Sequence, residues 1–502
     1  MKVENSPFKM LIPDDNVLPR SSPERQGIPS AAILDYIAAV ERHELGLHSF
    51  MLLRHGYVVA EGWWSPYQRH IPHILHSLTK GFTSTAVGLA IAEGLLAIDD
   101  PVISFFPEET PAEVSDNLLA MTVRHLLLMA TGHDGLVGDA IFSRLEANWA
   151  EIFLSMPVGH EPGNRFQYDD GRANMLAAII QKATGMKLID YLQPRLFAPL
   201  GIKSARWLEQ LNDTNVHGGY GLNLITEDIA RFGQLYLQKG VWQGQRILPT
   251  SWIAEATTAQ IATQIANESN PDSDWEQGYG YYFWRCRHHA YRADGAYGQF
   301  CLIMPDQDAV LAITAGSHDL QKILDMVWKH LLPAMGPEPL AEDTVAQEKL
   351  AQKSSALLIP PVQGQAESPL TSQISGRTYH VEPNKRQITA ITLDFSEAGC
   401  VARFQTPAGE ETIPCGFGEW RYGQTNLFEN LWDLVINTPT VAASGAWVSN
   451  NCFQIVVQLV ETPVSQTVRF DFGDNDTMNV EMWADLSIAP LEPRNLTAFF
   501  QP

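Results

Sequence analysis

The residues of this sequence that could do chemistry begin with a serine and a lysine three positions apart. They are Ser77 and Lys80, in the stretch 75–80 (LHSLTK). At a helix start, residues at this spacing lie on one face, so the hydroxyl and the amine can meet. A serine becomes a nucleophile when a nearby base takes its proton, and a lysine can be that base where burial or a neighbouring cation lowers its pKa. If Ser77 opens a buried helix, its backbone N–H is also free to help bind an oxyanion.

The same spacing occurs a second time, at Ser6 and Lys9, in a proline-interrupted tail. No apolar helix follows that copy, and we interpret it as chance. The Ser77 copy precedes an apolar pattern over 79–96 that predicts a helix. From spacing alone, the alternative for Ser77 is a helix N-cap.

A tyrosine-containing segment follows at 162–170 (PGNRFQYDD), with Tyr168 in the loop before a predicted helix. Taken in order with Ser77 and Lys80, it resembles the serine β-lactamase and penicillin-recognising superfamily, in particular class C β-lactamases, D-aminopeptidases, family VIII esterases and 6-aminohexanoate-dimer hydrolases. The resemblance covers roughly residues 20–335. Further stretches that carry it are 121–127 (MTVRHLL) with Thr131-Gly132, 221–235, and 278–280 (GYG).

The resemblance implies an acyl-enzyme mechanism. Ser77 would be the nucleophile and Lys80 its hydrogen-bonded base. Tyr168 would protonate the leaving group and activate water for deacylation, although a buried loop aromatic is its plainer interpretation. The backbone N–H groups of Ser77 and Ala296 would form the oxyanion hole.

Two motif positions depart from the family pattern. The second motif is usually Tyr-x-Asn, and here Asp170 takes the place of the asparagine. As a carboxylate beside Lys80, it would keep the lysine charged and weaken it as a base, or it could bind a cationic group of a substrate. The third motif is usually Lys/His-Thr-Gly, and its best match is 293–299 (ADGAYGQ), with Ala293 in the cation's place.

By the same resemblance, Gly295 and Gln299 of that segment would join Asp170 in binding the substrate. Without the cation, the usual anchor for a β-lactam carboxylate is missing, so we expect ester or amide hydrolysis rather than β-lactamase activity. The segment 217–219 (HGG) has similar letters but precedes a different element, and we discount it.

Other catalytic and metal motifs are absent from the sequence. There is no Gly-x-Ser-x-Gly elbow, no His-Glu-x-x-His and no phosphate-binding loop. The 15 histidines show no ligand spacing, so we expect neither a metal nor a cofactor. His133 could line the pocket, but we favour a structural role.

The elements that must position these residues are predicted to form one sheet, which both ends of the first 335 residues complete, with helices between them. Predicted strands are Phe50–Leu53, Tyr57–Ala60, Tyr279–Trp284, Phe300–Met304 and Val310–Ala315. Predicted helices are 31–43, 79–96, 121–129, 173–184, 226–237 and 320–332. With the resemblance, this predicts an α/β fold of the β-lactamase/transpeptidase type: an antiparallel sheet flanked by helices, with an all-helical subdomain.

The pattern changes after Pro337, which predicts three regions. Residues 1–338 would form the hydrolase domain, 339–376 a helical segment and linker, and 377–502 a small all-β barrel or sandwich. The β domain could cap the active site, mediate homodimerisation or bind a ligand.

Composition limits the partners. A net charge of −23 over 502 residues argues against binding nucleic acid or anionic lipid. No apolar stretch reaches the length of a membrane helix, and the N-terminus lacks the apolar core of a secretory signal. The 5 cysteines are odd in number and include no C-x-x-C pair, which indicates reduced thiols in the cytoplasm.

The sequence therefore predicts a serine hydrolase that acts on small esters, amides or short peptides. One alternative is a β-lactamase or D,D-peptidase. Another is a non-catalytic ligand-binding or sensor protein of the same fold.

Overall fold

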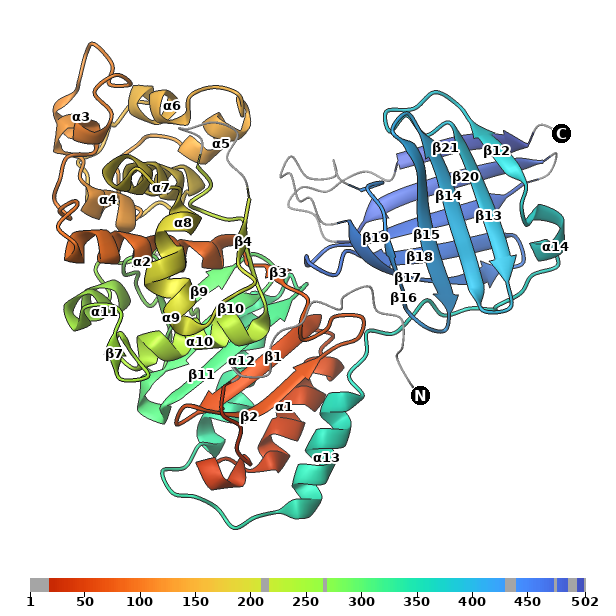
Figure 1. Cartoon of the computed structure of the whole chain (residues 1–502), viewed down its shortest axis with the longest axis horizontal. Helices are drawn as coiled ribbons and strands as arrows, with labels where there is room; N and C mark the ends of the chain where they lie inside the picture. The colour runs from red at the N-terminus through yellow and green to blue at the C-terminus, as the bar shows by residue number, and fades with distance from the viewer. Residues whose placement is uncertain are drawn as a thin grey trace. The chain divides into compact units, whose positions relative to one another are not determined.

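The chain forms two compact units in the computed structural model (Figure 1). The residues described are 18–208, 216–264, 269–428, 439–473, 476–485 and 494–500. The first unit comprises Asp14–Gly62 and Ile74–Ser354, and the second comprises Ser355 onward together with the short segment Trp63–His73. The predicted boundaries at 338 and 376 stay predictions.

A six-stranded sheet forms the centre of the first unit. Its order is β2 (Tyr57–Trp63), β1 (Leu47–Arg54), β11 (Ala309–Ala315), β10 (Gln299–Met304), β9 (Tyr291–Gly295) and β8 (Trp284–Arg285). β1 pairs antiparallel with β11, so that Leu52 lies opposite Leu311. Strands from the beginning and the end of the domain therefore complete one sheet, which confirms the predicted arrangement.

Helices cover both faces of this sheet. Every residue of β1, β10 and β11 is buried, which requires a layer on each side. α10 (Thr226–Leu237) packs against these three strands, and α1 (Ser30–Arg42) packs with α12 (Leu320–Met326) and the turn Val327–Leu331. α13 (Thr344–Ser355) follows them in the chain. Among the helices of the described ranges, none is long and apolar enough to span a membrane.

An all-helical subdomain lies between the sheet strands in sequence. Its helices are α2 (Thr79–Ala92), α3 (Asp116–Ala120), α4 (Val123–Leu127), α5 (Val137–Phe142), α6 (Trp149–Ser155), α7 (Asp170–Thr184), α8 (Leu188–Leu192) and α9 (Ala198–Leu200). α7 contacts α2, α4, α5 and α6. Nearly every residue of α2 is buried, including its lysine and its threonines, so other elements surround this helix.

Short elements complete the first unit. They are β3 (His73–Ile74), β4 (Arg206–Trp207), β5 (Leu222–Leu224), β6 (Val241–Trp242), β7 (Gln245–Arg246) and α11 (Thr250–Thr257). The predicted strand Tyr279–Trp284 is wrong except at its end, because Tyr282 has a left-handed φ of 66° and turns the chain. β9 was not predicted, since Arg292 and Asp294 interrupt its apolar pattern.

A closed β-barrel forms most of the second unit. Its strands are β12 (Thr378–Val381), β13 (Ala390–Ser396), β14 (Gly399–Thr406), β15 (Gly409–Phe417), β16 (Arg421–Gln424), β17 (Thr440–Ser449), β18 (Cys452–Gln458), β19 (Ser465–Phe472), β20 (Thr477–Ala484) and β21 (Arg494–Phe500). Parallel pairing of β15 with β17 closes the sheet. A short helix, α14 (Thr371–Ile374), precedes β12. The prediction of an all-β domain is confirmed, and its architecture is a barrel.

The segment Trp63–His73 folds with this barrel. Tyr67 and Ile71 share a buried cluster with Ala442 and Val460. The Tyr67 hydroxyl donates a hydrogen bond to the carbonyl of Thr462 at 2.9 Å.

Candidate active site

The serine of the first motif lies where a short turn enters a buried helix. Ser77 belongs to the 3₁₀ turn His76–Leu78, directly before α2. Ser77 is half-buried, whereas the residues on either side of it are buried. His76 has a left-handed φ of 47°, a backbone conformation that few non-glycine residues adopt. Ser77 is therefore the most exposed residue of this turn.

Lys80 connects three parts of the subdomain. Its ammonium donates to Ser77 Oγ at 2.9 Å, to Asp170 Oδ1 at 2.5 Å and to the carbonyl oxygen of Gly219 at 2.8 Å. The side chain is 1% exposed. All three N–H groups of the ammonium therefore have acceptors.

The charge on Lys80 follows from these contacts. Burial acts to lower the pKa of Lys80, but the charge and hydrogen bond of Asp170 outweigh it, and the pKa is raised above the ordinary value. Of the two predicted roles for Asp170, the structure shows the pairing with Lys80. The lysine is therefore charged at neutral pH.

Tyr168 lies against this ammonium. Lys80 Nζ is 4.9 Å from the centroid of the Tyr168 ring, which stacks on Trp284 at 5.7 Å. Burial raises the pKa of the Tyr168 hydroxyl, while Lys80 and a hydrogen bond with Ser77 act in the opposite direction. Tyr168 is therefore a neutral phenol at neutral pH, able to donate a proton.

The two aspartates that follow Tyr168 have different tasks. Asp169 is the N-cap of α7, where its Oδ1 accepts from the backbone N–H of Gly171 at 2.6 Å and of Gly138 at 3.1 Å. Asp170 is the first residue of the helix, and its side chain is 30% exposed. The cap fixes the helix start and so holds the Asp170 carboxylate at Lys80.

The segment that the sequence discounted, 217–219, also reaches the site. Gly219 supplies the third acceptor of Lys80, and Asn174 Oδ1 accepts from the N–H groups of Gly218 and Gly219 at 3.0 and 3.2 Å. A Cβ on Gly218 would lie 2.1 Å from the carbonyl oxygen of Ala173. The two consecutive glycines are the feature of the sequence that could have predicted this contact, because they permit the close approach of this backbone to α7.

The third motif lies at the end of β9, beside the nucleophile. A Cβ on Gly295 would lie 2.1 Å from the carbonyl oxygen of Leu75, so this strand touches the chain just before Ser77. Ala293, in the cation's place, lies 3.1 Å from the position of a Cβ on Gly81, in the first turn of α2. No cationic side chain therefore comes from position 293.

The neighbouring Asp294 is an acid where the family pattern has threonine. It is buried and pairs with the buried Arg292, whose Nε lies 2.9 Å from Asp294 Oδ2. Burial raises the pKa of Asp294, and the charge of Arg292 opposes that shift. Each charge of this pair is thus compensated within the protein.

Ala296 and Gln299 have unlike surroundings. Ala296 is half-buried at the turn after β9. Gln299 is fully buried, and its amide donates to the carbonyls of Ala296 at 3.0 Å and Ala315 at 2.7 Å. Gln299 thus holds the turn that carries Ala296, and its role in substrate binding stays a prediction.

Ser77, Lys80, Tyr168 and Asp170 are therefore brought together, with Gly295 alongside. His133 is held by two hydrogen bonds, from Nδ1 to Thr131 Oγ1 at 2.9 Å and from Nε2 to the Phe153 carbonyl at 3.1 Å, which favours a structural role. Within the described ranges, no group of three or more His, Cys, Asp or Glu residues could hold a metal.

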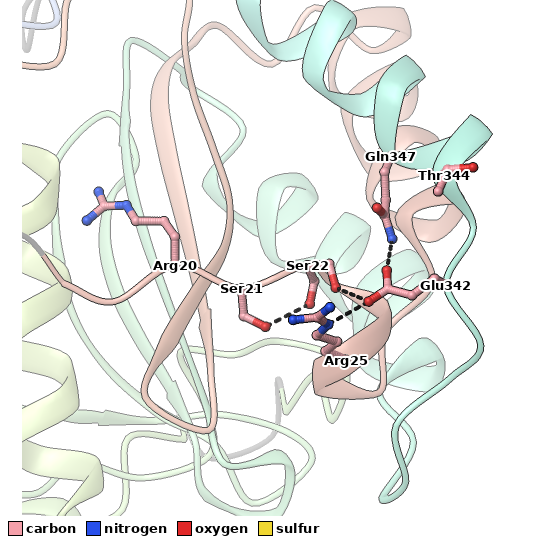
Figure 2. Close-up of a pocket in the computed structure, with 7 residues that line it drawn as sticks. All are labelled: Arg20, Ser21, Ser22, Arg25, Glu342, Thr344 and Gln347. Atoms are coloured by element: carbon pink, nitrogen blue, oxygen red, sulfur yellow. Dashed lines mark hydrogen bonds and ion pairs between the residues drawn. The ribbon is translucent and has the colours of Figure 1, made fainter.

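A separate hollow lies between the start of the described chain and α13 (Figure 2). It is lined by Arg20, Ser21, Ser22, Arg25, Glu342, Thr344 and Gln347. Arg25 pairs with Glu342 at 2.6 Å, whereas Arg20 points away from that pair and binds Glu227 at 2.9 Å. The guanidinium groups of both arginines that line the hollow are thus paired with carboxylates of the protein.

Known proteins resemble the first unit. Residues 21–322, more than half of the chain, match the family model described as Beta-lactamase. The 6-aminohexanoate-dimer hydrolase of Paenarthrobacter ureafaciens is 23% identical over 280 residues, which cover 52% of this chain and 71% of that protein. Esterase EstB of Burkholderia gladioli is 30% identical over 145 residues, 26% of this chain and 36% of that protein. A solved structure from Bacillus anthracis, provisionally named a 6-aminohexanoate-dimer hydrolase, matches with a TM-score of 0.51 at 19% identity, covering 65% of this chain and 89% of that one.

Proposed function

The chain belongs to the beta-lactamase family, and from that premise we propose that it hydrolyses small esters, amides or short peptides through an acyl-enzyme on Ser77. The observation that carries the proposal is the 2.9 Å contact between Lys80 Nζ and Ser77 Oγ at the entrance to a buried helix. A half-buried serine with a buried lysine three residues later is an arrangement suited to a nucleophile and its proton partner.

The reaction would proceed in two steps. Ser77 Oγ attacks the carbonyl carbon of the substrate, and its proton leaves through Lys80. The backbone N–H groups of Ser77 and Ala296 would bind the oxyanion, a role supported by the contact of Gly295 with Leu75. Tyr168, as a neutral phenol beside Lys80, would protonate the leaving group and then help water attack the acyl-enzyme.

The charges around Ser77 favour a substrate without a carboxylate on its leaving-group side. Ala293 supplies no cation, Lys80 has all three N–H groups engaged, and Arg292 is buried against Asp294. Anionic groups are normally anchored by a free Arg or Lys. We therefore favour esters and amides over β-lactams.

The proposal is tested by replacing Ser77 with alanine. Release of p-nitrophenol from p-nitrophenyl butyrate, and labelling by an alkyl fluorophosphonate followed by intact mass, would be compared in the wild type, Ser77→Ala and Ser155→Ala. Ser155 is an exposed serine of α6. We expect turnover to fall by about 10⁴-fold or more and labelling to vanish in Ser77→Ala alone.

Other outcomes separate the alternatives. Equal rates in all three proteins would contradict the proposal. Stable acylation of Ser77 by penicillin would favour a D,D-peptidase or β-lactamase. Folded protein with neither turnover nor labelling would favour a non-catalytic binder. This alternative follows from the charge on Lys80, because an ammonium cannot accept the Ser77 proton.

We also propose that the protein works in the cytoplasm. All 5 cysteines are free and buried, which supports a reducing, cytoplasmic setting. Homodimerisation and a ligand for the barrel stay hypotheses.

A further inference from the structure

We propose that Asp170 is the final acceptor of the Ser77 proton, which it receives through Lys80. The inference rests on the proposed function and adds a residue to its machinery. The family pattern has an asparagine at this position, which cannot take a proton. In this chain the acceptor would be built into α7 rather than provided by the lysine alone.

The geometry of Lys80 makes such an acceptor necessary. Its ammonium already donates to Ser77, Asp170 and Gly219 at 2.5–2.9 Å, so it has no lone pair for the Ser77 proton. Tyr168 carries its own proton and cannot take another. Within this hydrogen-bonded set, the Asp170 side chain forms the ion pair with Lys80 and has the oxygen atoms that can accept its proton.

The surroundings of Asp170 support this assignment. Titratable groups that interact electrostatically with it are Lys80, Tyr168, Asp169, His217, Tyr220, Tyr279 and Tyr282. Lys80 is the cation among them, since burial lowers the pKa of His217 to about 4 and raises the pKa of each tyrosine. Asp294 also interacts with Lys80, but its carboxylate is bound by Arg292.

The proton step balances without any other reactant. One N–H bond of Lys80 breaks as an O–H bond forms on Asp170 Oδ1, across the 2.5 Å contact. Rotation of the amine about its Cε–Nζ bond turns the new lone pair toward Ser77 Oγ. The Ser77 O–H bond then breaks, an N–H bond forms, and Oγ bonds to the acyl carbon. Lys80 is again an ammonium, and Asp170 is a carboxylic acid. When Tyr168 gives its proton to the leaving group, Lys80 reprotonates Tyr168, and the proton on Asp170 returns to Lys80.

The test is the pH dependence of acylation in Asp170→Asn. We would measure kcat/KM for p-nitrophenyl butyrate and the rate of fluorophosphonate labelling from pH 5 to 10, in the wild type, Asp170→Asn and Asp170→Glu. Asp190→Asn, at an exposed position of α8, is the matched control. Thermal unfolding by circular dichroism would verify that each variant is folded.

In Asp170→Asn we expect the rate at neutral pH to fall by about 10²–10⁴-fold, the usual effect of losing a general base. The remaining rate should rise with pH and level off once Lys80 is neutral, because Lys80 must first lose a proton to solvent and Asp170 no longer raises its pKa. Asp170→Glu should keep the wild-type pH profile at reduced height, and Asp190→Asn should match the wild type.

A rate in Asp170→Asn that falls equally at every pH, or does not fall, would overturn the relay. Ser77→Ala is measured alongside these variants, and if it abolishes turnover, the proposed function survives that result. Turnover in Ser77→Ala equal to that of the wild type would overturn the proposed function and the relay together.

Discussion

Buried titratable side chains in this protein keep or lose their charge according to the partners that the fold provides. Lys80 is buried and stays charged, because Asp170 supplies a carboxylate and Ser77 and Gly219 supply further acceptors. His133 is buried between a hydroxyl and a backbone carbonyl, and burial lowers its pKa to about 4. The same loss of hydration thus gives opposite outcomes.

His133 predicts a loss of stability in acid. Its folded pKa of about 4 lies below the unfolded value of 6.5, so the unfolded chain takes up the proton first as the pH falls. The free energy of unfolding is therefore highest above pH 6.5, and it falls as the pH drops toward 4. Protonation of His133 alone can lower it by roughly 3 kcal/mol at most. Urea unfolding of the wild type and His133→Gln at several pH values would measure it.

We expect the acid-dependent loss to be smaller in His133→Gln than in the wild type. His160→Gln, at an exposed position, should lose stability as the wild type does. Identical pH dependence in the His133 variant and the wild type would contradict a neutral, buried His133.

At the scale of elements, the site depends on backbone approaching backbone. β9 touches the turn before Ser77 at Gly295, and the 217–219 segment touches α7 at Gly218. His76 and Tyr297 both have left-handed φ values, of 47° and 65°, and their rings are in edge contact at 5.6 Å. These two residues flank the proposed oxyanion donors, Ser77 on one side and Ala296 on the other.

Gly295→Ala tests the contact between β9 and the nucleophile turn. The added methyl would lie 2.1 Å from the Leu75 carbonyl oxygen, so the strand must move away from the turn. We expect kcat/KM to fall by about 10²-fold, as for a displacement of about 1 Å, and the free energy of unfolding to fall by about 1–3 kcal/mol. Ester turnover and thermal unfolding would measure the two effects.

Gly135→Ala is the matched control, since its methyl would meet no atom closer than 3.6 Å. It should behave as the wild type does. Full activity in Gly295→Ala would show that the position of β9 does not govern catalysis.

At the scale of the whole molecule, one short segment from the N-terminal part of the chain folds as part of the barrel unit. The segment Trp63–His73 belongs to the barrel unit, although it precedes Ser77 by only a few residues in sequence. Tyr67 and Ile71 are 4% and 5% exposed because Ala442 and Val460 cover them. A chain without the barrel would therefore carry apolar side chains that need another partner.

Truncation after Ser355 tests this dependence. We expect the shortened protein to bind the dye ANS and to unfold at a lower temperature than the full chain, because Tyr67 and Ile71 become exposed. Replacing both residues with serine should reduce the dye binding of the truncated protein. A truncated chain that binds no dye and unfolds as the full chain does would show that the segment does not need the barrel.

Local patterns were enough to predict contacts between residues that are close together in the sequence. The spacing of Ser77 and Lys80 puts both on one face, and the apolar run after them makes α2 a buried helix. Alternation and helical periodicity likewise predicted the sheet completed by both chain ends, confirmed by β1 and β11. These features depend on the repeat of a helix or a strand, which the sequence carries directly.

The remaining contacts join residues far apart in the chain, and only the tertiary structure decided them. Asp170 and Gly219 reach Lys80 across 90 and 139 positions, so the choice between a cation site and a lysine partner depended on how α2, α7 and the 217–219 segment pack. Gln299 turned out to be buried for the same reason. Residue type states what a side chain can bind, but packing selects which of those partners lies within hydrogen-bonding distance.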